Sequence, residues 1–250
     1  MRHGRTDTMA EATGKAASAE WLEADGLGGF ASGTVGGERT RRYHALLLSA
    51  ATPPTGRVVL VNGIEASVET GAGAVPLTTQ RYAPDVRHPD GWRRVAAFAR
   101  SPWPSWTFAL DDGTALEQEI LVGRDGCETV LRWRRTAGDG PCRLSVRPLL
   151  SGRDYHALHR ENAGFDFRPT VRGGNVAWRP YADQPAVSAL TNGAYRHAPD
   201  WYRNFLYTAE RDRGLDGVED LASPGVFAFD LERGEAVMVL RAGDGLAARP

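Results

Sequence analysis

Apolar and polar residues alternate along short segments of this 250-residue chain, and residues that favour turns separate the segments. Alternation with a period of two predicts β-strands with one buried face, and Gly, Pro, Asn and Asp between them predict turns. No window of helical length carries a clean apolar stripe with a period of 3.6 residues. Strand follows strand, so the pattern excludes a parallel α/β sheet and predicts an all-β fold, a large antiparallel β-sandwich with few or no helices.

Hairpin turns are predicted at four places where apolar segments flank a short sequence that contains glycine. These turns are Asn62-Gly63, Asp111-Asp112-Gly113-Thr114, Ala137-Gly138-Asp139-Gly140 and Glu232-Arg233-Gly234. In the third hairpin, a symmetric loop places Trp133 opposite Leu144 and turns the neighbouring arginines outward. The same register keeps Cys127 far from Cys142, which argues against a disulfide between them.

The second half of the chain continues the strand pattern. Its strands are predicted at Phe165–Arg168, Asn175–Arg179, Ala186–Leu190, Tyr202–Glu210, Val226–Leu231 and Ala236–Leu240. No internal repeat and no break in composition demand a boundary, so residues 20–250 are expected to form one β-domain. Residues 1–19 are small, polar and patternless, and a disordered leader is expected there.

Composition narrows the classes of function. The formal net charge is -1 and hydrophobic residues make up 42% of the chain, which allows a sizeable core but argues against binding to nucleic acid or to a membrane surface. No segment has the length and apolar character of a transmembrane span or a signal peptide. The sequence contains two cysteines, Cys127 and Cys142, which is typical of a reducing, cytoplasmic setting.

The stretch from residue 20 to residue 48 is dense in glycine and in candidate functional residues. Its segment Gly26-Leu27-Gly28-Gly29-Phe30-Ala31 formally matches the dinucleotide-binding fingerprint, which must open a helix after a strand. The next six residues, Ser32-Gly33-Thr34-Val35-Gly36-Gly37, cannot propagate a helix, so a nucleotide site is rejected. Arg39-Thr40-Arg41-Arg42-Tyr43-His44 then precedes the apolar run Ala45–Leu48, which predicts a polar cluster at the end of a buried strand.

Two further polar clusters follow this first one. The second comes after Arg147-Pro148-Leu149 and consists of residues expected on the loop beyond a strand, where binding residues concentrate: Arg153, Asp154, Tyr155 and His156. The third combines Trp201 and Tyr202, whose rings could stack on a sugar, with the charged segment that contains Arg213, Asp216, Glu219 and Asp220. Structural interpretations stand beside these functional ones. The first cluster could form ion pairs with acidic loops. In the third cluster, the charged residues could order a loop, and Phe205, Leu206 and Tyr207 could be plain core.

These motifs resemble the N-terminal domain of the bacterial and archaeal glycogen debranching enzymes, the amylo-α-1,6-glucosidase family. The similar sequences are Glu-Trp-Leu, Gly-Leu-Gly-Gly-Phe-Ala-Ser-Gly-Thr, Thr-Arg-Arg-Tyr-His, Arg-Pro-Leu, Arg-Asp-Tyr-His, Trp-Tyr, Asn-Phe, Arg-Gly-Leu-Asp, Glu-Asp-Leu and Ser-Pro-Gly. Ala45 stands where the family usually has glycine. The resemblance implies a supersandwich-like β-domain that precedes an (α/α)₆-barrel glucosidase domain. That barrel carries the family's general acid and base, and it is absent from this chain.

Neither a catalytic pair nor a metal or cofactor site is expected in the chain. Glycoside hydrolysis needs two carboxyl groups about 5–9.5 Å apart, whereas the adjacent Glu219 and Asp220 point to opposite faces of an extended segment. His156 and His159 lack a placed carboxylate partner for a metal ion. Because the chain belongs by resemblance to a glycoside hydrolase family but lacks the barrel, it is expected to be inactive alone.

The sequence thus predicts a non-catalytic domain that packs on a glucosidase barrel, in the same or a separate polypeptide, and helps to shape the cleft for α-glucan. Glycogen or a maltooligosaccharide would be that glucan. Candidate residues for the substrate or for the domain interface are Arg41, Arg42, Tyr43, His44, Arg153, Asp154, Tyr155, His156, Trp201, Tyr202, Arg213, Asp216, Glu219 and Asp220. Two alternatives stay open, a stand-alone α-glucan-binding module and a purely structural docking domain, and glucose release by the chain would be needed to support a third, a self-sufficient hydrolase.

Overall fold

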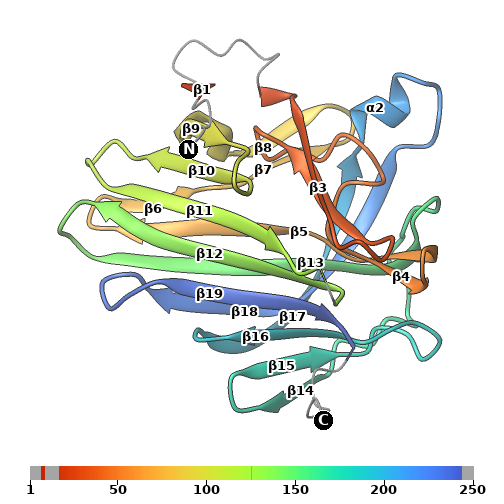
Figure 1. Ribbon diagram of the computed structural model, residues 1–250. Helices are drawn as coiled ribbons and strands as arrows, with labels where there is room; N and C mark the ends of the chain where they lie inside the picture. Colours follow the sequence, from red (N-terminus) through yellow and green to blue (C-terminus); the bar gives the residue numbers. More distant parts are fainter. Residues whose placement is uncertain (1–6, 9–16, 125, 244–250) are drawn as a thin grey trace.

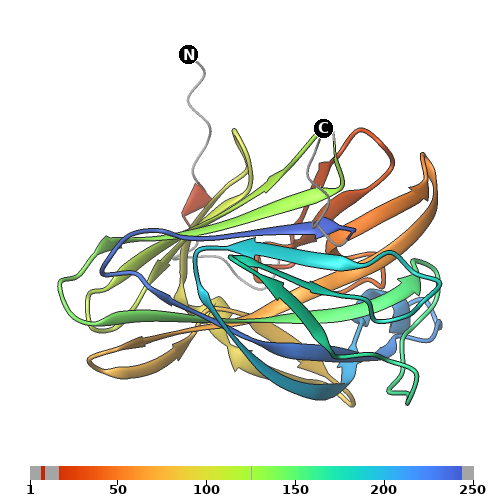
Figure 2. The ribbon, with the colours of Figure 1, turned by 90° about the horizontal axis from the view of Figure 1, so that it is seen from below.

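Two antiparallel sheets stack face to face (Figures 1 and 2). Apolar side chains from both sheets form the main buried core between them. The computed structural model describes residues 7–8, 17–124 and 126–243. Helical structure in this part of the chain is short: a 3-10 turn, Gly91–Arg94, and the helix α2, Thr208–Arg211. The predicted all-β antiparallel sandwich is therefore confirmed.

The first sheet, here called sheet A, contains nine strands among the described residues. In order across the sheet they are β1 (Asp7–Thr8), β9 (Val95–Ala99), β10 (Ser105–Ala109), β11 (Ala115–Val122), β12 (Glu128–Ala137), β19 (Ala236–Ala242), β16 (Val187–Thr191), β15 (Asn175–Trp178) and β14 (Pro169–Arg172). The C-terminal strand β19 thus lies in the middle, between β12 and β16. It joins one half of sheet A, built from earlier strands, to the other half, built from later ones.

The second sheet, sheet B, contains ten strands of the described chain and carries the three polar clusters. Its order is β2 (Glu20–Ala24), β3 (Phe30–Thr34), β4 (Ala45–Thr52), β5 (Thr55–Thr70), β13 (Cys142–Asp154), β18 (Val218–Asp230), β17 (Ala194–Leu206), β7 (Thr79–Tyr82) and β8 (Val86–Asp90), with β6 (Gly73–Pro76) paired beside β5. Strands β4, β5, β13 and β18 are neighbours, so segments far apart in the sequence end side by side (Figure 1).

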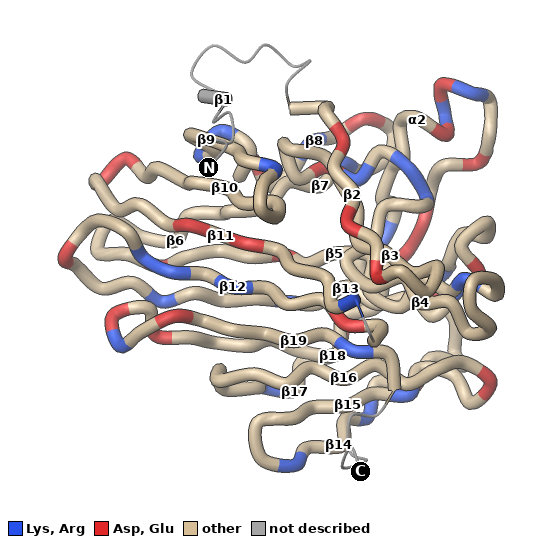
Figure 3. Tube along the Cα trace, in the orientation of Figure 1, with Lys and Arg blue, Asp and Glu red and all other residues tan. Residues whose placement is uncertain are grey.

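The two faces of sheet A differ in the way that the alternation predicts. Leu131 and Trp133 of β12 are fully buried and belong to the main core with Leu144 of β13. On the outer face, Arg132 pairs with Glu119 at 3.1 Å, and the Arg134–Glu117 pair lies beside it. Figure 3 shows the corresponding acidic residues along β11 and basic residues along β12. This face is a ladder of exposed ion pairs, typical of a solvated surface.

Two of the four predicted hairpins are wrong because their strands lie in different sheets. β12 pairs with β11 and β19 in sheet A, whereas β13 pairs with β5 and β18 in sheet B. The chain likewise crosses from β18 to β19. In both cases the apolar rows face each other across the core instead of lying side by side. Cys127 and Cys142 are both free, as expected, and they lie beyond opposite ends of β12.

A third predicted turn, Asn62-Gly63, is also wrong, since both residues lie inside the continuous strand β5. The turn at residues 111–114 is confirmed, because β10 and β11 pair on either side of it. Several strand bounds differ as well, among them the start of β18, which is Val218 and not the predicted Val226. Residues 165–168 are not a strand, β13 extends to Asp154, and β17 ends at Leu206 before α2.

Most of the predicted leader lies outside the described residues, so the prediction of disorder stands there as a prediction. Asp7–Thr8 pairs with β9, and the carbonyls of Ala17 and Ala19 accept hydrogen bonds from Gly36 and Val35, each at 2.8 Å. Across the described residues, no helix has the length and apolar character that crossing a membrane requires.

Candidate functional site

The three polar clusters meet at one end of sheet B, and the Arg42 side chain links them. Arg42 lies in the loop between β3 and β4. Its guanidinium donates to the carbonyl of His156 at 2.6 Å, in the loop after β13, and to the carbonyl of Asp216 at 2.9 Å, in the loop before β18. Because β4, β13 and β18 belong to the same sheet, a single side chain can reach both neighbouring loops.

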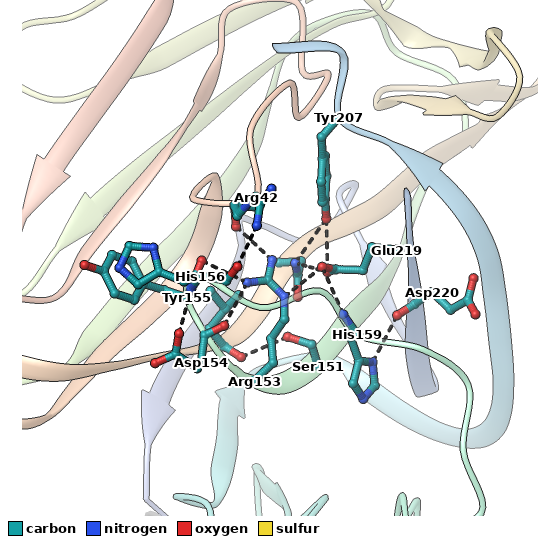
Figure 4. A network of polar contacts seen from close by, with 12 residues as sticks. Arg42, Ser151, Arg153, Asp154, Tyr155, His156, His159, Tyr207, Glu219 and Asp220 are labelled. Atoms are coloured by element: carbon teal, nitrogen blue, oxygen red, sulfur yellow. Dashed lines mark hydrogen bonds and ion pairs between the residues drawn. The ribbon is translucent and has the colours of Figure 1, made fainter. Parts of the chain in front are cut away.

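A fully buried acid lies beneath these loops. Glu219, with no exposed surface, forms an ion pair with Arg153, which is 5% exposed, and the Nε–Oε2 distance is 2.7 Å (Figure 4). Its other oxygen accepts hydrogen bonds from the Asn62 amide at 2.7 Å and from the Tyr207 hydroxyl at 3.0 Å. Burial raises the pKa of Glu219, and Arg153 opposes that shift. A carboxylate so enclosed is suited to holding strands together and has no access to a substrate.

A second buried acid, Glu210 of α2, extends the network to the Arg42 side chain. Its carboxylate accepts a hydrogen bond from the Arg42 backbone N–H at 3.2 Å, and the Arg42 guanidinium lies 3.4 Å away. Arg213 donates to the same group at 2.8 Å. Arg153 donates to the Arg42 carbonyl at 2.8 Å, which connects the Glu210 and Glu219 groups. Arginine and glutamate side chains therefore alternate along this network and hold the loops together. Most of these side chains have little contact with solvent.

Three aromatic rings form the exposed part of this end of the molecule. The Tyr43 hydroxyl lies 3.1 Å from Nδ1 of His156. The ring centroids of Tyr155 and His156 are 3.9 Å apart, and those of Tyr43 and Tyr155 are 5.5 Å apart. Asp154 accepts a hydrogen bond from the His156 backbone N–H at 2.8 Å, which fixes the turn. His156 is exposed and both tyrosines are half-buried, so this aromatic group can contact a ligand or another domain.

His44 and Arg41 hold the first loop to the edge strand β2. The Arg41 guanidinium lies 2.5 Å from the Glu20 carboxylate, and Nε2 of His44 lies 3.5 Å from the same group. Nδ1 of His44 accepts a hydrogen bond from the Thr40 backbone N–H at 3.1 Å. Burial lowers the pKa of His44 to about 4, with Arg41 and Arg39 adding to the shift and Glu20 opposing it. A buried, neutral His44 is suited to ordering the loop.

Trp201 and Tyr202 lie on β17 and already have packing partners. The Trp201 ring lies 5.3 Å from Phe165 and 5.4 Å from His159, centroid to centroid. Tyr202 lies under the Arg147 guanidinium, at 5.5 Å, and packs on a separate small apolar cluster of sheet B. Both rings are half-buried, and their contacts favour a packing role over the predicted sugar stacking.

The acidic residues of the third cluster point in different directions. Asp220 accepts backbone hydrogen bonds from Asn204 at 2.9 Å and Glu161 at 3.1 Å, whereas Glu219 turns to Arg153. Asp216 is exposed and contributes its carbonyl to Arg42. Glu219 and Asp220 thus bind different partners, as expected for adjacent residues of an extended segment. Among the described residues, no three His, Cys, Asp or Glu side chains gather closely enough to hold a metal ion.

Several residues that build the site were not among the sequence candidates. Asn62 was assigned to a turn and Tyr207 to plain core, and both bind Glu219. Glu210 was placed at the end of a strand, and it anchors Arg42. Asn62 is a polar residue inside an otherwise apolar segment, which is the one signal that could have marked it. Glu210 carries no such signal, because charged residues follow it directly.

Comparison with known proteins gives a family match and a distant structural similarity. A family model described as "Glycogen debranching enzyme N terminal" matches residues 19–238. Among solved structures, the chain is similar to a bacterial glucoamylase complexed with acarbose, with 12% sequence identity and a TM-score of 0.37. That alignment covers 98% of this chain and 34% of the glucoamylase chain, so this chain spans about a third of its length. No curated protein matches the chain.

Proposed function

Because the chain belongs to the glycogen debranching enzyme N-terminal family, we propose that it is a non-catalytic domain that packs on an (α/α)₆ glucosidase barrel. In this proposal, residues 20–250 form one cytoplasmic domain, and its loops help to shape the cleft that receives an α-glucan. The barrel would be supplied in the same or a separate polypeptide. It would provide the general acid and base, so the chain alone would be inactive.

The observation that carries the proposal is the joining of three loops by Arg42. The loops contain the motifs shared with the family, and Arg42 holds two of them by their carbonyls at 2.6 and 2.9 Å. Loops supported by buried ion pairs present their exposed side chains in a fixed geometry. Tyr43, Tyr155 and His156 are then available at the surface, while the charged residues beneath them are not.

The two outer faces of the sandwich differ in how well they suit packing on a barrel. The outer face of sheet A carries a ladder of ion pairs, which is costly to remove from water. On sheet B, Leu149, Phe205 and Leu221 form a buried apolar cluster apart from the main core, and Tyr82 and Tyr202, which cover it, are partly exposed. We therefore assign the barrel-facing side to sheet B, continuous with the three loops.

The test is kinetic and uses the chain assembled with its barrel. His156→Ala is expected to raise KM for a branched α-glucan several-fold with little change in kcat, because His156 would contact substrate without taking part in bond cleavage. Arg172→Gln, an exposed change on β14 in sheet A, is the matched control. Unchanged KM in a correctly folded His156→Ala enzyme would contradict the proposed role of the loops.

A stand-alone α-glucan-binding module is the second candidate, favoured by the exposed aromatic group. Tyrosine rings can lie against the C–H face of a pyranose, and Tyr43 and Tyr155 are partly exposed beside His156. Glycogen in a native gel would then retard the isolated chain, and Tyr155→Ala would abolish the retardation. A chain that migrates normally in glycogen would leave the docking domain as the better account.

A further inference from the structure

Sheet B curls back on itself at β7. In the order of the sheet, β13, β18 and β17 lie between β5 and β7. Tyr82 of β7 pairs with Phe205 of β17, yet the Gln80 side chain of β7 donates to the Ile64 carbonyl of β5 at 3.0 Å. The Ala66 carbonyl of β5 also accepts a hydrogen bond, at 2.9 Å, from the backbone two residues before β7. The strands β5, β13, β18, β17 and β7 therefore curve around a common interior.

The face of sheet B that points away from sheet A lies inside this curl. Leu149 of β13, Phe205 of β17 and Leu221 of β18 form a cluster separate from the main core, and all three are buried. The residues that follow Leu149 and Leu221 in the sequence belong to the main core, so these two side chains point to the opposite face. Tyr82 and Tyr202 pack against the cluster and are partly exposed. The two tyrosines therefore mark the opening of the curl to solvent.

Glu65 of β5 lies at this opening. It is directly opposite Arg147 of β13 in the ladder, and the Arg147 guanidinium lies 5.5 Å from the centroid of the Tyr202 ring. Burial raises the pKa of Tyr82 to about 12 and also raises that of Tyr202, and in both cases the Glu65 charge adds to the shift. One carboxylate thus acts on both hydroxyls, which brings the acid and the two rings together.

The Glu65 carboxylate has no hydrogen bond and no ion pair with any residue that the structure describes. Its oxygens are not among the enclosed polar atoms of that part of the chain, so they reach solvent. Burial raises the pKa of Glu65, and the charges of Arg147 and His88 oppose the shift. Arg147 is bound elsewhere, since it donates to the Ala198 carbonyl and to the Ser223 hydroxyl, each at 3.2 Å. The opening therefore presents an accessible carboxylate beside two aromatic rings.

We propose that this opening receives an arginine side chain from the surface of the barrel. The inference rests on the proposed function, which packs sheet B on that barrel. Packing removes the remaining water from Glu65, and a carboxylate left without a partner in an interface is costly. A guanidinium satisfies both carboxylate oxygens with parallel hydrogen bonds, and its flat face can lie against a tyrosine ring. Lysine supplies the charge but not this geometry.

The first experiment titrates the full chain with N-acetylarginine methylamide and follows the ring resonances of Tyr82 and Tyr202 by NMR. N-acetylcitrulline methylamide, in which a neutral urea replaces the guanidinium, is the reference compound. We expect saturable shifts with the arginine compound alone. Glu65→Gln should weaken this binding several-fold, because it removes the charge and keeps the shape. Glu69→Gln, an exposed change on the same strand, should bind as the unmodified chain does.

Equal shifts with the two compounds, or equal binding in the unmodified chain and Glu65→Gln, would overturn the inference and leave the KM test of His156 unaffected. A second measurement is the affinity of the full chain for the barrel supplied as a separate polypeptide. Glu65→Gln is expected to weaken that association roughly tenfold or more, and an unchanged affinity would likewise overturn the inference. An unmodified chain that does not associate with the barrel would contradict the proposed function and this inference together.

Discussion

His44 and Glu219 are both buried, and burial shifts their pKa values in opposite directions. It lowers the pKa of His44 to about 4 and raises that of Glu219. In each case burial favours the neutral form, because the charged form loses its hydration. The ion pair with Arg153 opposes this shift at Glu219, and Glu20 opposes it at His44. Single buried residues therefore make the stability of the loops depend on pH.

His44 gives this dependence a definite sign. Its folded-state pKa of about 4 lies below the ordinary value of 6.5, so its contribution to stability is present above pH 6.5 and is lost as the pH falls toward 4. A shift of this size corresponds to about 3 kcal/mol. We expect the free energy of unfolding, measured with urea at several pH values, to fall across this window and to fall less steeply in His44→Asn.

The control for that measurement is His156→Asn, which changes an exposed histidine and should keep the full slope. The pKa of His159 is also lowered by burial, so part of the slope is expected to persist in His44→Asn. An unchanged slope in His44→Asn would show that another group titrates in this window.

At the scale of elements, the loop after β13 and the loop before β18 are held mainly through their backbone carbonyls. Arg42 donates to both, and Glu210 positions Arg42. Contacts to carbonyls constrain the chain whatever side chains the loops carry. The backbone of these two loops can then stay the same while their side chains vary. The β3–β4 loop fixes that backbone, because it contains Arg42.

Arg42→Met tests this arrangement because it keeps much of the apolar stem and removes the donors. We expect amide hydrogen exchange at residues 155–160 and 212–217 to become roughly tenfold faster or more, which corresponds to about 1.4 kcal/mol of lost local stability. Arg41→Met is the matched control, since Arg41 binds the exposed Glu20 instead. Equal exchange rates in the two variants would show that other contacts hold the loops.

The strand pattern predicted most elements but not how they pair. β12 and β13 each carry a buried apolar row and an exposed polar row, and such strands can lie side by side or face each other across a core. The local alternation is the same in both cases. The sequence therefore does not show that the chain passes from sheet A to sheet B at residues 138–141. The turn predicted at Asn62-Gly63 was wrong because a tertiary contact outweighs the local preference. The pair favours a turn, but the Asn62 amide lies inside a strand and binds the buried Glu219.

The sequence identified several residues of the candidate site but not the contacts that bring them together. The motifs identified Arg42, Arg153 and Glu219, and the structure joins all three in one network. Tyr207 escaped because an aromatic residue beside Phe205 and Leu206 is typical of a core strand, whereas its hydroxyl binds Glu219. Glu210 escaped because its partner Arg42 lies 168 residues away in the sequence. Pairings of that separation are set by the order of strands in sheet B, which alternation alone does not determine.

At the scale of the whole molecule, β19 connects the two halves of sheet A. It pairs with β12 on one side and with β16 on the other. Leu240 of this strand is fully buried and lies opposite both Thr129 and Ala189. A change at this position affects the packing of both halves at once.

Leu240→Ala is expected to lower the free energy of unfolding by about 2–5 kcal/mol, since it leaves a cavity at the centre of the sandwich. Leu190→Ala on the adjacent strand is the matched control, because Leu190 is 42% exposed and its removal should cost less than about 1 kcal/mol. Urea denaturation measures both. Similar losses in the two variants would argue against the central place of β19 in stability.

The central position of β19 also has a consequence for the order in which the protein can fold during synthesis. The ribosome releases the N-terminal residues first, at about 5–20 residues per second. Until residues 236–242 emerge, β12 and β16 have no partner on their facing edges, and open strand edges are sites of aggregation. The nascent chain can assemble sheet B from strands that all precede residue 231, but sheet A can close only after residues 236–242 have emerged. A ribosome that stalls before residues 236–242 have emerged would therefore release a substrate for chaperones or proteases.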